Sequence, residues 1–361
     1  MQEQKLHLAD KTLSEEAIDI LMQLISIPSL SKEEDKTAEL LFSYLQKKGI
    51  QCERKLNNVW AVNNFFDPKK PSILLNSHHD TVQPNKGYTK NPFDAHIEDG
   101  KLYGLGSNDA GGCLVSLLAV FIHFYNQPDL KYNLIYAATA EEEISGNNGI
   151  EMLLPFIGEI DFAIVGEPTQ MHLAVAEKGL LVIDCIAKGK AGHAAREEGD
   201  NAIYKALKDI EWFKQYEFPK VSEHLGKVKM SVTIINAGSQ HNVVPDTCTF
   251  TVDIRVTDCY THDEIINMIR QQVSCEVIPR SIRLKSSSIS SSHPAVKAGR
   301  KLGRKTYGSP TCSDQALLNM PSLKMGPGDS ARSHTANEFI FVTEIEEGIE
   351  LYIKLLNEII L

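Results

Sequence analysis

Hydrophobic positions along the chain change their spacing near residue 178, and this change predicts two kinds of structure. Before it, short runs that are apolar at every position alternate with helical segments; the clearest runs cover residues 73–75, 133–138 and 162–165. Strands that are apolar on both faces and separated by helices are typical of a buried, mostly parallel sheet. The first part of the chain is therefore predicted to be an α/β domain with helices flanking the sheet.

The second part of the chain shows a different period. In residues 249–256, apolar side chains alternate with polar ones, which is typical of a strand with one buried face. The elements around it follow the order strand, helix, strand, strand, helix, strand, which predicts a ferredoxin-like α+β module. We expect this module to form a domain of residues 179–290, inserted into a first domain of residues 1–178 plus 291–361.

Two helix starts are predicted from capping patterns. Ser31 followed by Glu34 matches a capping box, and Gly49 supplies the stop for the helix that this pair would begin. Near the C-terminus, Thr343 followed by Glu346 predicts the start of a last amphipathic helix.

Charge and composition limit the classes of partner. The 361 residues carry a formal net charge of -10 at pH 7, which argues against a nucleic-acid or anionic-membrane surface because both need clustered Lys and Arg. Residues 1–10 lack the basic start and apolar core of a signal peptide, and no apolar run approaches the roughly 18 residues that span a bilayer. The seven cysteines include no C-x-x-C pair, which argues against a thiolate zinc site. We expect a cytoplasmic protein that acts on small molecules, with no nucleic-acid or membrane partner.

Ionisable side chains follow the predicted buried strands at the point where each strand ends. In an open parallel sheet the carboxyl ends of the strands form the ligand crevice, so these side chains are expected to converge. The positions at strand ends, or in glycine-rich turns between the strands, are His78, Asp80, Asp109, Glu141, Glu142, Glu143, Glu167 and His334.

A cluster of His, Asp and Glu without Cys suits a hydrolytic zinc or cobalt centre better than a structural zinc site. His78 and Asp80 lie two apart on an extended strand, so they point the same way and the carboxylate can hydrogen-bond the far ring nitrogen, while His79 points elsewhere. Taken singly, residues 141–143 would be the solvated first turn of a helix and Asp109 a turn residue. Their coincidence at one predicted crevice favours a pair of metal ions that share one carboxylate.

The order and spacing of these motifs resemble the M20 family of metallopeptidases and deacylases, in the branch of acetylornithine deacetylases and succinyl-diaminopimelate desuccinylases. The resemblance covers almost the whole chain and is carried by SHHDTV, GLGSNDAGG, TAEEE, VGEPT, KAGHAA and GPGDSARSH, with Asn337 and Glu338 behind the last of them. The chain departs from the family in having Ser77 and Leu105 where Gly and Arg are frequent. Neither departure falls on a residue that would bind a metal.

The resemblance implies a catalytic domain with two divalent ions, zinc first and cobalt as the alternative. One ion would be held by His78, Asp109 and Glu167. The other would be held by Asp109, Glu143 and His334, so that Asp109 bridges the pair.

The resemblance also assigns roles beside the ligands. Asp80 would orient His78, and Glu142 would be the general base, with Glu141 in the family's Asp position. The peptide bond between Asp109 and Ala110 would be cis, as it is in the family.

From the inserted domain, which the resemblance makes a dimerisation or lid domain, His193 would donate to the oxyanion of the partner subunit in a homodimer. Arg255, with Asn242, would hold the substrate carboxylate, a task that suits a fork-like guanidinium. Without the family, His193 would be taken for an exposed loop histidine. Arg255 could equally be a solvent-facing arginine of the sheet.

The function expected from the resemblance is removal of the acyl group from an N-acyl amino acid. Acetylornithine deacetylase in arginine biosynthesis comes first, with acetylcitrulline or succinylornithine as variant substrates. Succinyl-diaminopimelate desuccinylase is second, and an aminopeptidase or dipeptidase is third. A catalytically silent binding protein is disfavoured because Glu142 and every ligand are present.

Overall fold

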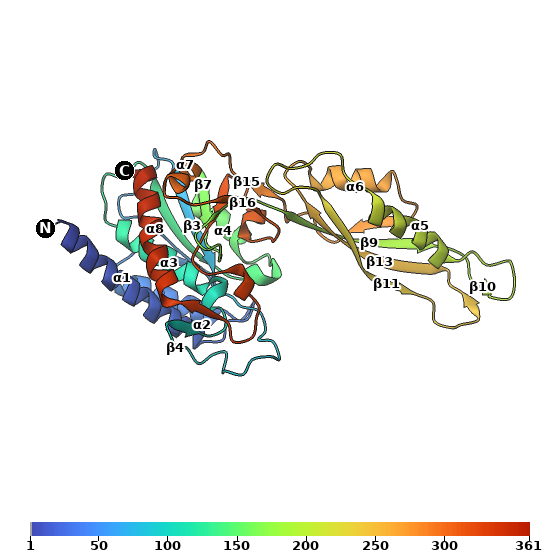
Figure 1. The fold of residues 1–361 in the computed structure, drawn as a ribbon, viewed down its shortest axis with the longest axis horizontal. Helices are drawn as coiled ribbons and strands as arrows, with labels where there is room; N and C mark the ends of the chain where they lie inside the picture. The colour runs from blue at the N-terminus through green and yellow to red at the C-terminus, as the bar shows by residue number, and fades with distance from the viewer. Residues whose placement is uncertain (1) are drawn as a thin grey trace. The chain divides into compact units, whose positions relative to one another are not determined.

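The computed structural model describes residues 2–361, with side chains from Leu13 onward, and divides the chain into two compact units (Figure 1). The first unit contains residues 1–175, 288–307 and 313–361. The second contains residues 176–287 and also 308–312, a short segment outside the expected range of 179–290.

A nine-stranded sheet is the centre of the first unit. Its middle strands β6, β3, β7 and β17 are parallel, while β1, β2 and β8 are antiparallel to their neighbours. The predicted mostly parallel sheet is therefore confirmed. In spatial order the strands are β1 (Cys52–Lys55), β2 (Asn58–Val62), β6 (Asn133–Thr139), β3 (Ser72–His78), β7 (Phe162–Val165), β17 (Ser322–Lys324), β8 (Leu173–Glu177) and β15 (Ser287–Ser288), with β16 (Thr306–Ser309) beside β8.

Helices cover both faces of this sheet because its central strands are apolar on both sides. Ile73 and Leu75 of β3 belong to the core shared with α1, α2, α3 and α8, whereas Leu74 faces the opposite layer with α4. Helices α1, α3 and α8 lie together in Figure 1. The helices of the unit are α1 (Gln2–Ile25), α2 (Asp35–Lys47), α3 (Gly112–Phe124), α4 (Ile150–Ile157), α7 (Pro294–Lys301) and α8 (Val342–Ile360).

Short elements connect these layers. A separate three-stranded sheet has the order β18, β5, β4. These elements are β4 (His96–Glu98), β5 (Lys101–Tyr103), β18 (Phe339–Phe341) and the short helical turns η1 (Ser107–Gly111), η2 (Glu142–Ile144), η3 (Asp314–Leu317) and η4 (Ser330–Arg332).

One stretch, Ser107–Phe124, is long and apolar enough to cross a membrane, although none was expected to approach that length. It contains α3, and 83% of it is buried inside the structure. A helix that is apolar on all sides is also what the core of a large domain requires, so the stretch is weak evidence for a membrane span.

The second unit is a four-stranded antiparallel sheet with two helices. Its strands follow the spatial order β11, β13, β9, β14, which confirms the predicted ferredoxin-like module. The apolar positions of residues 249–256 are buried, as their alternation predicted. The elements are β9 (Gly179–Lys188), β10 (Gly192–His193), α5 (Ala202–Gln215), β11 (Lys229–Ala237), β12 (Val243–Val244), β13 (Thr247–Val256), α6 (His262–Arg270) and β14 (Glu276–Pro279).

The first capping prediction is wrong. Helix α2 has no side-chain cap hydrogen bond. Ser31 Oγ instead donates to Asp80 Oδ2 at 2.7 Å, and the Glu34 carboxylate is fully buried. The predicted stop is confirmed, because Gly49 has a left-handed φ of 73° directly after the helix.

The second capping prediction is wrong by two residues, because the N-cap is Phe341 and not Thr343. Helix α8 begins at Val342, and the Glu344 carboxylate, not Glu346, accepts the N–H of Phe341 at 3.0 Å. Thr343 therefore lies inside the first turn of the helix, because Glu344 and not Glu346 makes the capping hydrogen bond.

Candidate metal centre

Three adjacent parallel strands bring the candidate residues to one edge of the sheet. His78 is the last residue of β3, Glu142 and Glu143 follow β6, and Glu167 follows β7. Because β3 pairs in parallel with both β6 and β7, their carboxyl ends lie side by side. The expected convergence of strand ends is therefore present.

Two groups of three side chains at this edge have the geometry to hold a metal ion. In the first, His78 Nε2 lies 3.5 Å from Asp109 Oδ1 and 3.8 Å from Glu167 Oε1. In the second, His334 Nε2 lies 3.5 Å from Asp109 Oδ2 and 3.0 Å from Glu143 Oε2. Each oxygen of Asp109 thus faces a different group, and the groups have the same membership as the two ligand sets that the family resemblance implies.

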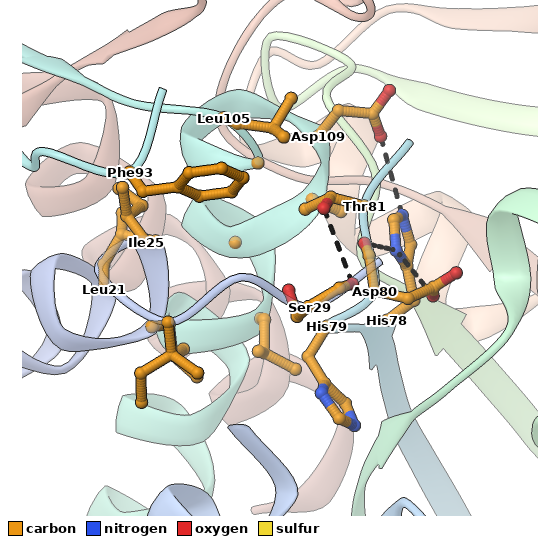
Figure 2. Close-up of a pocket in the computed structure, with 16 residues that line it drawn as sticks. Leu21, Ile25, Ser29, His78, His79, Asp80, Thr81, Phe93, Leu105 and Asp109 are labelled. Carbon is orange, nitrogen blue, oxygen red and sulfur yellow. Dashed lines mark hydrogen bonds and ion pairs between the residues drawn. The ribbon is translucent and has the colours of Figure 1, made fainter. Parts of the chain in front are cut away.

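His78 fits the role of a metal ligand by its hydrogen bonding. Its Nδ1 donates to the backbone carbonyl of Asp80 at 3.0 Å and lies 3.4 Å from the Asp80 carboxylate (Figure 2). The main anchor is therefore the carbonyl, where the carboxylate was expected. Its Nε2 is buried and has no hydrogen-bond partner among the described side chains. A ligating imidazole uses one nitrogen for the ion and anchors the other in this way.

Carboxylates surround both candidate histidines, and they raise the pKa of each imidazole. Burial would lower the pKa of His78, but Glu142 and the neighbouring aspartates outweigh burial and raise that pKa well above its ordinary value. The hydrogen bond to Glu143 raises the pKa of His334 to about 9. The surroundings of both rings therefore favour positive charge, which is what divalent cations would supply.

Glu142 lies beside the centre but belongs to neither group. Its Oε2 is 3.9 Å from His78 Nε2, and its side chain is mostly buried. Burial raises the pKa of Glu142 well above its ordinary value, and Glu167 and Asp314 raise it further. A carboxylate with a raised pKa beside the metal groups has the property that a general base needs near neutral pH.

The backbone at Asp109 is held by Glu338, which the sequence marked only as a residue that follows the last family motif. The backbone N–H groups of Asn108 and Asp109 both donate to Glu338 Oε1, at 2.8 and 2.9 Å. Burial raises the pKa of Glu338 to about 8. The peptide bond between Asp109 and Ala110 is cis, as the resemblance implied.

Asp80 has more contacts than its predicted role required. Its Oδ1 accepts the N–H of Glu142 at 3.0 Å, and its Oδ2 accepts the N–H of Glu143 at 3.2 Å and the hydroxyl of Ser31. Burial opposes ionisation, but the nearby His78 ring and the hydrogen bond from Ser31 lower the pKa of Asp80 below its ordinary value. The carboxylate is thus held as an anion under the turn that carries the base candidate.

His79 points away from the centre, as predicted. Its Nδ1 shares a hydrogen bond with the Thr37 hydroxyl at 2.9 Å, and its Nε2 donates to the Asn57 carbonyl at 2.7 Å. Burial lowers the pKa of His79 to about 4. The ring is therefore a neutral structural group.

This burial predicts a loss of stability in acid. Between pH 6.5 and pH 4 the unfolded chain binds a proton at His79 and the folded chain does not, so the free energy of unfolding falls by about 3 kcal/mol as the pH drops through this window. Urea unfolding of the metal-free protein at pH 7.5 and pH 4.5 measures it, and His79→Gln should lose this part of the pH dependence. The exposed His241→Gln is the control, and an equal pH dependence in both variants would contradict the assignment.

The candidates of the second unit fall in two places. His193 is exposed on β10 and pairs with Val243, while the N–H of Ala194 donates to the Asn242 carbonyl at 3.0 Å. His193 and Asn242 are therefore neighbours. Arg255 lies near the other end of β13.

Arg255 is already paired within its own strand. Its Nε and Nη2 donate to the two carboxylate oxygens of Asp253, at 2.9 and 3.1 Å. This bidentate contact is the one expected of a sheet-surface arginine, and a substrate carboxylate would have to compete with it.

Comparisons with known proteins identify the family of this chain. Residues 74–358 match the model of peptidase family M20/M25/M40. The chain is 25% identical to the succinyl-diaminopimelate desuccinylase of Rickettsia bellii, over 94% of this chain and 95% of the relative. It is 27% identical to the acetylornithine deacetylase of Buchnera aphidicola, over 94% of this chain and 97% of the relative.

A solved structure shows the same fold. The YXEP protein of Bacillus subtilis, a dinuclear metal binding peptidase from the M20 family, superposes with a TM-score of 0.73 at 17% identity, over 96% of this chain and 98% of that one. With a family model that matches most of its length, this chain belongs to the M20 peptidase family and is a metal-dependent hydrolase.

Proposed function

We propose that this hydrolase removes the acyl group from an N-acyl amino acid in the cytoplasm, as an acetylornithine deacetylase of arginine biosynthesis or a close variant that takes acetylcitrulline or succinylornithine. The observation that carries the reaction type is the pair of three-residue groups sharing Asp109, with the Glu142 carboxylate beside them. The Buchnera relative supports this substrate class, since the similarity spans nearly all of both chains.

Succinyl-diaminopimelate desuccinylase is the second candidate. The similarity to the Rickettsia relative favours it, because that match is as long and nearly as close. Both reactions hydrolyse a linear amide of an amino acid, so the proposed chemistry is the same.

The five ligands would hold two divalent ions, zinc first and cobalt as the alternative, which supply Lewis-acid polarisation of a carbonyl and acidify water towards a pKa of about 7. Glu142 would accept a proton from water at its carboxylate and return it to the nitrogen of the leaving amine. Asp80 would hold His78 and the backbone of Glu142 in place during both transfers.

A panel of substrates tests this function. Purified protein with zinc or cobalt, with and without chelator, should hydrolyse one of acetylornithine, acetylcitrulline, succinylornithine or succinyl-diaminopimelate, and chelation should abolish the activity. Hydrolysis of dipeptides alone would make the protein a peptidase. Binding without turnover across the panel would make it a silent binding protein.

We also propose a homodimer. Strand β11 is an edge of its sheet, and Ile234 and Ile235 on it are about half exposed. Tyr204 and Leu207 of α5 in the same unit are also exposed. Apolar side chains on a sheet edge and a helix of the same unit are a surface that a second copy would cover.

His193 is proposed to act in the partner subunit's site, as the family resemblance implies, and complementation tests this. His193→Ala and Glu142→Ala subunits should each be nearly inactive with normal metal content. After random mixing, half of the dimers are mixed, each with one intact site, so about a quarter of wild-type activity should return. No recovery, with mixed dimers shown to form, would refute action in trans, and full activity of His193→Ala would refute the role itself.

A further inference from the structure

The loop between α1 and α2 lies against the segment that carries the centre. The Thr81 N–H donates to the Ser29 carbonyl at 2.9 Å, and Leu30 forms a parallel bridge with Thr81. Figure 2 shows Ser29 beside Thr81, next to His78 and Asp80. The loop therefore runs beside the end of β3 and does more than connect two helices.

Ser31 uses this placement to reach the Asp80 carboxylate. Its hydroxyl donates at 2.7 Å, the shortest of the hydrogen bonds that Asp80 accepts, and it has no capping contact with α2. Hydrogen bonds to an ionised acceptor are the stronger class, so this contact fixes the orientation of a buried carboxylate. Asp80 in turn accepts the N–H groups of Glu142 and Glu143.

Glu34 braces the same loop from the other side. Its Oε1 accepts the N–H of Lys32 at 2.6 Å and the N–H of Glu141 at 3.3 Å, and its Oε2 accepts Asn57 Nδ2 at 2.8 Å. The loop side chains thus hold the turn 141–143 at three successive backbone N–H groups, the first through Glu34 and the other two through Ser31 and Asp80.

We propose that Ser31 is a positioning residue for the hydrolytic centre: its hydroxyl sets the Asp80 carboxylate, and Asp80 sets the base Glu142 and the ligand Glu143. This inference rests on the roles proposed for Glu142 and Glu143. Because Asp80 also lies against His78 Nδ1, Ser31 acts on a residue of each metal group at once.

Zinc titration of metal-free protein and steady-state kinetics on a hydrolysed panel substrate test this role. Ser31→Ala should weaken zinc binding and lower kcat, each by about tenfold, the low end of the effect of losing a direct outer-sphere partner, because Ser31 acts through Asp80; KM should change by less than about twofold. Ser31→Thr keeps the hydroxyl and should restore most of both. Ser26→Ala is the matched control, since its hydroxyl in the same connection donates only to the Met22 carbonyl.

Three results would overturn the inference. One is wild-type zinc affinity and kcat in Ser31→Ala, whether or not its midpoint of thermal unfolding falls. Another is a Ser31→Thr protein no better than Ser31→Ala, and the third is an equal loss in Ser26→Ala. If the wild-type protein itself fails to bind two equivalents of zinc, the proposed function fails first and the inference falls with it, so the two failures are distinguishable.

Discussion

Glu142→Gln is expected to lower kcat by about 10²–10⁴-fold while two equivalents of metal stay bound. Glutamine keeps the size of the side chain but cannot take up a proton, and general-base catalysis accounts for a factor of this size. The residue lies outside both three-residue groups, with its carboxylate 3.9 Å from His78 Nε2. Single-turnover kinetics and metal analysis of the same protein sample measure the two quantities together.

The matched control for this variant is Glu141→Gln. Glu141 is the adjacent acid and is more buried, but its carboxylate accepts both the side-chain and the backbone nitrogen of Asn148, at 2.8 and 3.2 Å. It should turn over substrate at close to the wild-type rate. Loss of metal from Glu142→Gln would show that Glu142 is a ligand, and equal losses in both variants would show that the effect is structural.

The sequence predicted the fold and the position of the centre because both depend on regular patterns. Runs that are apolar at every position predicted buried parallel strands, and parallel strands place their carboxyl ends together. His78 and Glu167 could therefore be assigned to one edge before any distance was known. The grouping of ligands into two sets needed the family motifs, since Asp109 and His334 lie in loops whose course no periodicity predicts.

The errors have a common physical cause. Ser31 and Glu34 match a capping box letter for letter, yet their side chains are used by residues 49 and 107 positions away in the chain. A local pattern cannot show that a tertiary acceptor such as Asp80 competes with the helix N-terminus for the same hydroxyl. Glu338 was passed over for the same reason, because its partners are backbone N–H groups, which carry no sequence signal.

The pairing of Arg255 follows from a local pattern, the spacing of two residues between Asp253 and Arg255 on one strand. Strand alternation placed it on the outward face, but Asp253, two residues earlier, is on the same face and within reach. The bidentate pair between them could have been predicted from this spacing. The contacts of Arg255 therefore favour the role of a sheet-surface arginine over binding of the substrate carboxylate.

Asp109→Ala is expected to remove both metal ions and all activity, whereas Glu167→Ala should keep one ion. The two oxygens of Asp109 face different groups, with His78 Nε2 and His334 Nε2 each at 3.5 Å, so this one carboxylate completes both sets. Glu167 belongs to one set only. Zinc affinity at both sites of Asp109→Ala should fall by more than the roughly 100-fold that loss of an outer-sphere partner costs.

Zinc calorimetry on metal-free protein separates the two ligand classes by stoichiometry: two equivalents for the wild type, one for Glu167→Ala and none at tight affinity for Asp109→Ala. The exposed Asp129→Ala changes the net charge equally and should bind two. The distinction follows from charge as well as geometry, because each group brings a histidine together with carboxylates that repel one another until a cation is present. If Asp109→Ala still binds one equivalent tightly, Asp109 does not bridge, and the two groups are separate sites.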